Sequence, residues 1–138
     1  MWRARNLNRL VLVLLLASTD ASAAECTKAQ AMSAENEAST LNSWKAVHKS
    51  FQRYAHCDDG AIAEGYSESI TLLLANQWST LASLVKLMAE DPPFERFIIR
   101  HIDETVPRER LTKIASNAKR SCPKKHRSLC ERLYKATE

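Results

Sequence analysis

Apolar residues recur at steps of three and four along the chain from about residue 41 onward, the period of a helix that buries one face. No segment alternates apolar and polar residues in the manner of a strand, and only Gly60 and Gly65 are glycines. The pattern therefore predicts an all-α protein, a compact bundle of five to six helices.

Capping and turn residues divide this pattern into segments. The two aspartates before Gly60 predict a break at which an aspartate caps the next helix and glycine accepts the tight turn. Ser79 or Thr80 is placed to cap a further helix, and Pro92 and Pro93 are placed to begin another. The predicted helices span residues 39–56, 60–78, 81–90, 94–102 and 107–121, with a last short helix around residues 129–133.

The first 23 residues carry the three parts of a secretory signal peptide. Three arginines precede a short apolar run, Leu10 to Ala17, and small residues occupy positions 21–23, before the expected cut. The run is shorter than the roughly 20 apolar residues that span a bilayer. A lipoprotein signal is the alternative because Cys26 follows closely, but Glu25 stands where lipid attachment favours a small residue. We expect a mature protein that is periplasmic or secreted.

Removal of residues 1–23 leaves residues 24–138, a length typical of a single helical domain. Four cysteines remain, and an even number in an oxidising compartment predicts two disulfides. Of the three possible pairings we favour Cys26–Cys57 and Cys122–Cys130, since both keep their loops local. One straight helix from residue 26 to residue 57 would hold its ends about 45 Å apart, so this pairing requires the chain to reverse between residues 35 and 39.

Charge is distributed unevenly along the mature chain. Residues 24–95 carry 5 Lys and Arg against 10 Asp and Glu, whereas residues 96–138 carry 12 against 5. The second segment contains a predicted basic surface formed by Lys119, Arg120, Lys124, Lys125 and Arg127. Such a run is typical of a solvated helix face. As a binding surface in an exported protein it favours anionic lipid, glycan or an acidic protein over nucleic acid.

Four carboxylates follow Cys57 within a short stretch, at Asp58, Asp59, Glu64 and Glu68. Glu64 and Glu68 share a helix face by their four-residue spacing. The stretch is interpreted either as a helix cap held by a disulfide or as an acidic surface that binds a basic partner. A metal site that includes His56 is a weaker alternative because the spacing of a calcium loop is absent. We expect no metal and no cofactor.

Catalytic interpretations find little support in the residue pattern. Residues 65–69 resemble a nucleophile elbow, but they lack its second glycine and fall inside a predicted helix. Two carboxylates from the set Asp58, Asp59, Glu64 and Glu68, at the acidic start of the second helix, could serve a small hydrolase as a catalytic pair. His48 and His101 lie beside apolar helical positions, where hydrogen-bonded core histidines are common. Three aromatic side chains, Trp44, Tyr66 and Trp78, are expected in the core for the same reason. We therefore predict a protein that is not an enzyme.

The stretch from Cys57 to Ser67, together with Asn117-Ala118 and Cys122-Pro123, resembles small exported helical proteins of Gram-negative bacteria, most of them of unassigned function. In size, export, helix content and a disulfide, the chain is also similar to periplasmic immunity proteins that protect bacteria from type VI secretion amidase toxins. That resemblance implies an extracytoplasmic protein-binding module, an inhibitor or immunity protein against a cell-wall-targeting toxin. The alternatives are an envelope-surface protein that binds anionic lipid or glycan through its basic carboxy-terminal third, and the small hydrolase.

Overall fold

The computed structural model describes residues 24–138, so the predicted signal peptide lies outside the described residues. This part of the chain is all-α, with seven α-helices and no strand. The number of helices slightly exceeds the five to six expected. The α-helices are α1 Lys28–Ala38, α2 Trp44–Tyr54, α3 Gly60–Asn76, α4 Leu81–Glu90, α5 Pro92–Arg100, α6 Arg108–Arg120 and α7 Arg127–Ala136. Single 3-10 turns at Ala55–Cys57, Trp78–Thr80 and Lys124–His126 precede α3, α4 and α7.

The additional helix is α1, which the hydrophobic pattern does not mark because its buried face consists of alanines. Its start is a capping box in which Thr27 and Gln30 satisfy each other's backbone N–H groups. Ala34 and Ala38 are fully buried, and α1 packs on α3. A Cβ placed at Gly65 would lie 2.8 Å from the Ala38 Cβ, so glycine at position 65 permits this close approach.

The reversal required by the first disulfide occurs later than expected. Because α1 continues to Ala38, the chain turns between residues 39 and 43. Ser43 then caps α2 by accepting a hydrogen bond from the Ala46 N–H at 3.2 Å. Residue 39 was the predicted start of a helix and instead lies in the turn.

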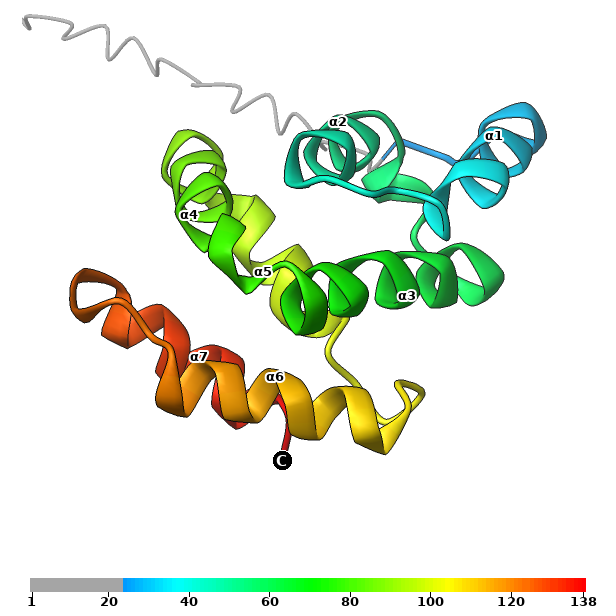
Figure 1. Cartoon of the computed structure of the whole chain (residues 1–138). Helices are drawn as coiled ribbons and strands as arrows, with labels where there is room; N and C mark the ends of the chain where they lie inside the picture. Colours follow the sequence, from blue (N-terminus) through cyan, green and yellow to red (C-terminus); the bar gives the residue numbers. More distant parts are fainter. Residues whose placement is uncertain (1–23) are drawn as a thin grey trace, which may run out of the picture.

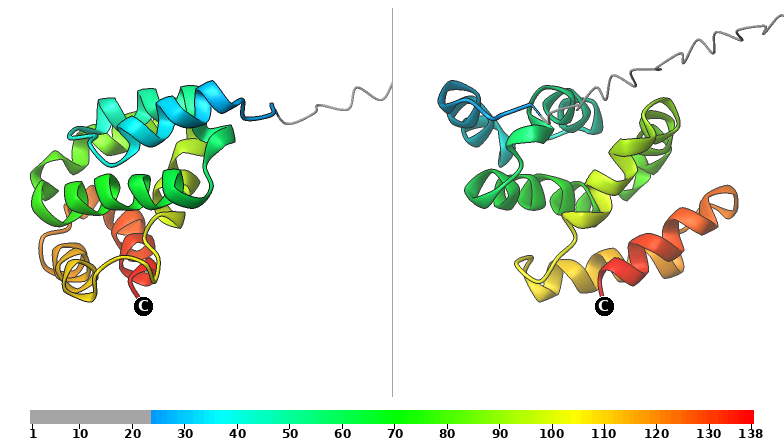
Figure 2. Two further views of the ribbon diagram at one scale, coloured as in Figure 1. Left: turned by 90° about the vertical axis from the view of Figure 1, so that its right-hand side faces the viewer. Right: turned by 180° about the vertical axis from the view of Figure 1, so that it is seen from behind.

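The helices form three stacked layers (Figures 1 and 2). The pair α1 and α2 forms one outer layer, and the antiparallel hairpin of α6 and α7 forms the other. Between them lies α3, which packs on α1 on one side and on α6 on the other. The helices α4 and α5 extend beside α3, where α4 contacts α2 and α5 contacts α7. The loop from α5 to α6 therefore carries the chain from the middle layer to the hairpin (Figure 1).

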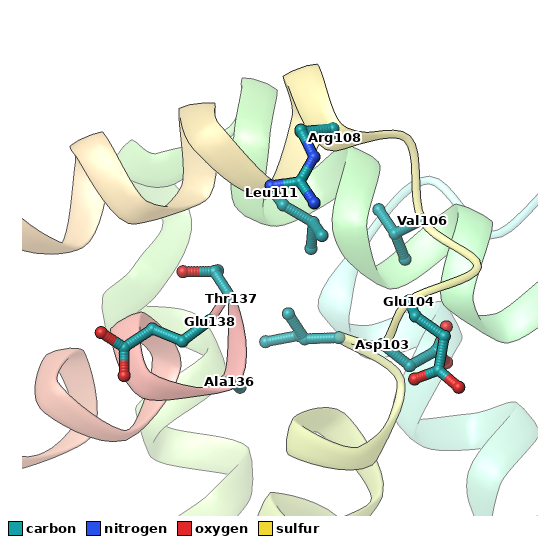
Figure 3. A pocket seen from close by; sticks show the side chains of 9 residues that line it. Asp103, Glu104, Val106, Arg108, Leu111, Ala136, Thr137 and Glu138 are labelled. Atoms are coloured by element: carbon teal, nitrogen blue, oxygen red, sulfur yellow. The ribbon is translucent and has the colours of Figure 1, made fainter.

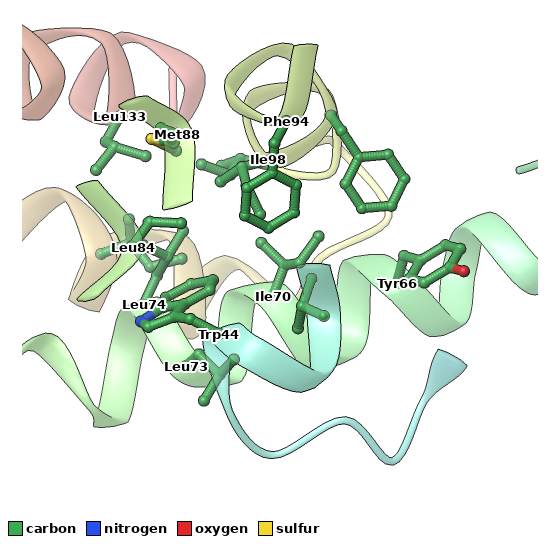
Figure 4. Close-up of a cluster of buried hydrophobic side chains, with 14 of the residues drawn as sticks. Trp44, Tyr66, Ile70, Leu73, Leu74, Leu84, Met88, Phe94, Ile98 and Leu133 are labelled. Carbon is green, nitrogen blue, oxygen red and sulfur yellow. The ribbon is translucent and has the colours of Figure 1, made fainter. Parts of the chain in front are cut away.

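The core is filled by the apolar faces that the sequence pattern predicts. Side chains from α2, α3, α4, α5 and α7 converge on one cluster of buried residues (Figure 4). Its members include Trp44, Tyr66, Ile70, Leu73, Leu74, Leu84, Met88, Phe94, Ile98 and Leu133. Trp78 is only partly buried, and its indole N–H donates to the Ser121 carbonyl at 2.9 Å. This bond ties the turn before α4 to the end of α6.

Both predicted disulfides are present, Cys26–Cys57 and Cys122–Cys130. The first joins the segment before α1 to the turn that precedes α3. The second joins the end of α6 to α7 and closes the tip of the hairpin. Within residues 24–138 no helix combines the length and apolar character needed to cross a membrane.

Candidate functional site

The four predicted carboxylates divide into two places, and Asp58 belongs to the interior. Its side chain is 3% exposed. One carboxylate oxygen lies 3.0 Å from His101 Nε2, and the other pairs with the guanidinium of Arg100. Asp58 therefore joins the turn before α3 to the end of α5 and is not part of an exposed acidic surface.

Asp59 and Gly60 form the helix start that the sequence predicts. Asp59 is exposed and occupies the N-cap of α3, where its carboxylate accepts a hydrogen bond from the Gly60 N–H at 2.8 Å. Gly60 has a φ of 51°, in the left-handed region that glycine adopts without steric strain. The role of Asp59 as a cap is confirmed.

Glu64 and Glu68 lie together beside the loop from α5 to α6. With Ser67, Thr105, Val106 and Pro107 they line a hollow of about 310 Å³. Glu68 forms a two-point ion pair with Arg110 on α6, with N–O distances of 2.5 and 3.1 Å. Glu64 is exposed and has no ion-pair partner among residues 24–138.

This hollow is the concave surface that the hydrolase interpretation requires at these two carboxylates. However, Arg110 engages both carboxylate oxygens of Glu68. A glycosidase needs two carboxylates that face the scissile bond from opposite sides. The ion pair leaves Glu64 without such a partner in this hollow. The neighbouring hydroxyls of Ser67 and Ser69 are buried and donate to Asp103 and to the Ala38 carbonyl, so both have structural roles.

The loop between α5 and α6 is held in place by Asp103, which sequence reasoning missed. One carboxylate oxygen accepts hydrogen bonds from the backbone N–H and hydroxyl of Thr105, at 2.8 and 2.6 Å. The other accepts from the Ser67 hydroxyl at 3.1 Å. Burial opposes the charge, but these hydrogen bonds outweigh it and lower the pKa of the Asp103 carboxyl. The spacing Asp-x-Thr between two predicted helices is the signal that marks such a turn.

A second hollow, of about 430 Å³, lies on the other side of this loop (Figure 3). Side chains reach it from the loop, from the first turns of α6 and from the end of α7 (Figure 3). It is lined by Ile102, Asp103, Glu104, Val106, Arg108, Leu111, Ala136, Thr137 and Glu138. Val106 lines both hollows, so the two flank a single loop.

Carboxylates outnumber cations around these two hollows. We refer to Glu64, Glu68, Asp103, Glu104 and Glu138 as the acidic end. Arg108 lines the larger hollow, and Arg110 is occupied by Glu68. Glu64 and Glu104 are exposed and form no ion pair with any residue between 24 and 138. The floor of the larger hollow is apolar, with Ile102 and Val106 only 4% and 6% exposed.

The predicted basic residues gather at the tip of the α6–α7 hairpin. We refer to Lys119, Arg120, Lys124, Lys125 and Arg127 as the basic corner. All five are exposed, and within the described part of the chain none forms an ion pair. The Lys119 ammonium lies 4.0 Å from the centre of the Tyr134 ring, which holds this side chain in a cation–π contact. The Cys122–Cys130 disulfide closes the corner.

The two core histidines form hydrogen bonds, as expected. His48 Nε2 lies 2.9 Å from Asp91 Oδ2, and His101 contacts Asp58 as described above. His48 and His101 stand at the two ends of a row of tilted and edge-on rings, with Phe51, Phe94, Phe97 and Tyr66 between them. His56 Nε2 is buried without a hydrogen-bond partner in the described structure. Residues 24–138 contain no group of three or more His, Cys, Asp or Glu side chains arranged to hold a metal ion.

No protein-family model, curated protein or solved structure matches this chain. The geometry described above is therefore the basis for any assignment of function.

Proposed function

We propose that the protein is an extracytoplasmic, non-enzymatic binding module that captures a basic segment of a partner protein at its acidic end. In this proposal it acts as an inhibitor or immunity protein against a cell-wall-targeting toxin. The two disulfides support an oxidising compartment. The observation that carries the proposal is the pair of hollows on either side of one loop, both rimmed by carboxylates.

The larger hollow suits a lysine or arginine side chain. Such a side chain lays its aliphatic stem on apolar surface and keeps its charged group among polar partners. Ile102, Val106 and Leu111 offer the apolar surface, and Glu104 and Glu138 lie on opposite sides of the hollow (Figure 3). Asp103 contributes a charge that its hydrogen bonds hold in place.

The burial of Asp58 makes it unsuitable for a substitution that tests binding. Asp58 is buried in an ion pair, so its replacement would damage the fold and report nothing about binding. Glu64 and Glu104 are the suitable positions, because both are exposed and each lines one of the two hollows.

The test is affinity capture from an envelope extract with the variant Glu64→Lys/Glu104→Lys, followed by mass spectrometry. The matched control is Glu35→Lys/Glu90→Lys, which makes the same charge change at exposed positions on α1 and α4. We expect the first variant to lose a partner that the unaltered protein and the control retain, while all three keep the same helical circular-dichroism spectrum. Retention of the same partners by both variants would overturn the proposal.

A further inference from the structure

The α6–α7 hairpin separates opposite charges at its two ends. The helix α6 begins at Arg108, beside the acidic end, and finishes at Arg120 in the basic corner. The helix α7 returns from Arg127 to Ala136, which lines the larger acidic hollow. The two charged groups therefore lie at opposite ends of one rigid hairpin (Figures 1 and 2).

The separation is long enough for the two ends to act independently. Thirteen residues of α6 at 1.5 Å each span about 20 Å. The Debye length at physiological ionic strength is about 8 Å. The carboxylates of the acidic end therefore leave the field of the basic corner largely intact. Glu131, one turn after Arg127 on α7, is the acidic residue nearest in sequence and forms no ion pair with the corner within residues 24–138.

We propose that the basic corner binds the surface of an anionic phospholipid bilayer and that the acidic end then faces away from it. This inference is independent of the proposed function, because it uses a different set of side chains. It concerns binding at the headgroup level only, since Met32 and Leu72 are the large apolar side chains exposed among the described residues and neither belongs to the hairpin. The attraction rests on charge complementarity with lipid phosphates.

A bilayer fits this corner better than a ligand of fixed shape. The five cations come from three successive elements at the tip of a hairpin. Within residues 24–138 only Lys119 has its side chain held by a cation–π contact, and the other four form no hydrogen bond or ion pair through their side chains. Lipids diffuse laterally, so phosphates can collect beneath each cation without a matching pocket. An acidic protein or a glycan presents its charges at fixed spacings and would need more defined geometry.

Binding of the basic corner to a bilayer also orients the acidic end, where the proposed partner site lies. Like charges repel at short range, so orientations that bring the acidic end close to an anionic surface are disfavoured, and binding through the basic corner leaves the acidic end toward solvent. A protein held in this way presents both acidic hollows to a partner approaching from the aqueous side. The membrane contact and the partner contact can therefore exist at the same time.

The test measures partition of the purified mature protein, residues 24–138, onto phosphatidylcholine vesicles with and without phosphatidylglycerol, by sedimentation. The variant is Lys124→Gln/Lys125→Gln/Arg127→Gln. The matched control, Lys28→Gln/Lys45→Gln/Lys49→Gln, removes the same charge from exposed positions on α1 and α2. Each basic residue near an anionic surface changes the partition coefficient about fivefold. We therefore expect the partition coefficient of the first variant to fall about a hundredfold and that of the control to fall far less. Added salt should release the unaltered protein.

Equal losses in both variants, or no loss in the first, would overturn the proposal. Retention on heparin that needs Lys124, Lys125 and Arg127, without retention on anionic vesicles, would overturn it in favour of an anionic glycan. Orientation has its own measurement, because amide hydrogen exchange with vesicles present should slow at residues 121–127 and stay unchanged at residues 103–107. Protection of both segments would contradict the orientation.

Discussion

His101 Nε2 lies 3.0 Å from Asp58 Oδ1, and each side chain is only 3% exposed. The other ring nitrogen, Nδ1, lies 2.7 Å from the Phe97 carbonyl, which can only accept a hydrogen bond. Nδ1 is therefore the donor in this second hydrogen bond. The buried bond between His101 and Asp58 connects the turn that precedes α3 to the end of α5, where the loop to α6 begins.

We expect Asp58→Asn to lower the free energy of unfolding by about 2–3 kcal/mol, because His101 and Arg100 lose a largely buried charge partner. The matched control is Asp59→Asn, since asparagine caps helices as well as aspartate does and residue 59 is exposed. Urea unfolding followed by circular dichroism measures both. Similar losses from the two variants would contradict a special role for Asp58.

Gly65→Ala should destabilise the protein by about 1–3 kcal/mol even though alanine favours helix formation. The added Cβ would lie 2.8 Å from the Ala38 Cβ and 3.0 Å from the Ser39 backbone nitrogen, so α1 must shift away from α3. The melting temperature of Gly65→Ala is compared with that of the unaltered protein by thermal unfolding. Glu64→Ala is the control, because it introduces alanine at an exposed position of the same helix. An unchanged melting temperature for Gly65→Ala would show that α1 can move without cost.

Stability should fall in acid through Asp103. Its pKa is lower in the folded protein than the ordinary value, so its contribution is present above about pH 4 and is lost as the pH falls through the folded pKa. In Asp103→Asn the residue no longer titrates, and we expect a shallower loss of stability below about pH 4. Urea midpoints across this pH range measure the effect. If the urea midpoints of the unaltered protein and of Asp103→Asn fall in parallel as the pH is lowered, other groups cause the loss of stability in acid.

The two disulfides should contribute unequally. Cys26 and Cys57 are separated by 31 positions and Cys122 and Cys130 by 8, and a longer loop restricts the unfolded chain more. Paired alanine substitutions should cost about 4 kcal/mol for the first bridge and about 2.5 kcal/mol for the second. Each bridge joins one buried and one partly buried cysteine, which makes the pairs comparable. A larger loss of unfolding free energy on removing Cys122–Cys130 than on removing Cys26–Cys57, measured by urea unfolding, would contradict this loop-length explanation.

The amino-acid sequence was sufficient for the features that depend on near neighbours. The apolar spacing predicted α3 to α6 closely, because a helix forms from contacts between residues three and four apart. The cap at Asp59, the turn at Gly60 and both disulfides followed from local chemistry and short loops. The five residues of the basic corner lie near the same turn because they are close in sequence.

The tertiary structure decided what the acidic residues do. Asp58 and Asp59 are neighbours, yet one is buried against His101 and the other caps a helix in solvent, because α5 packs against one side of that turn. Glu64 on α3 and Glu104, 40 residues further along the chain, line two hollows that share Val106, which no local pattern indicates. Such pairings depend on how whole helices pack, and packing is the sum of many weak contacts over the core. The spacing of residues determined the helices, and the packing of the helices placed the charges.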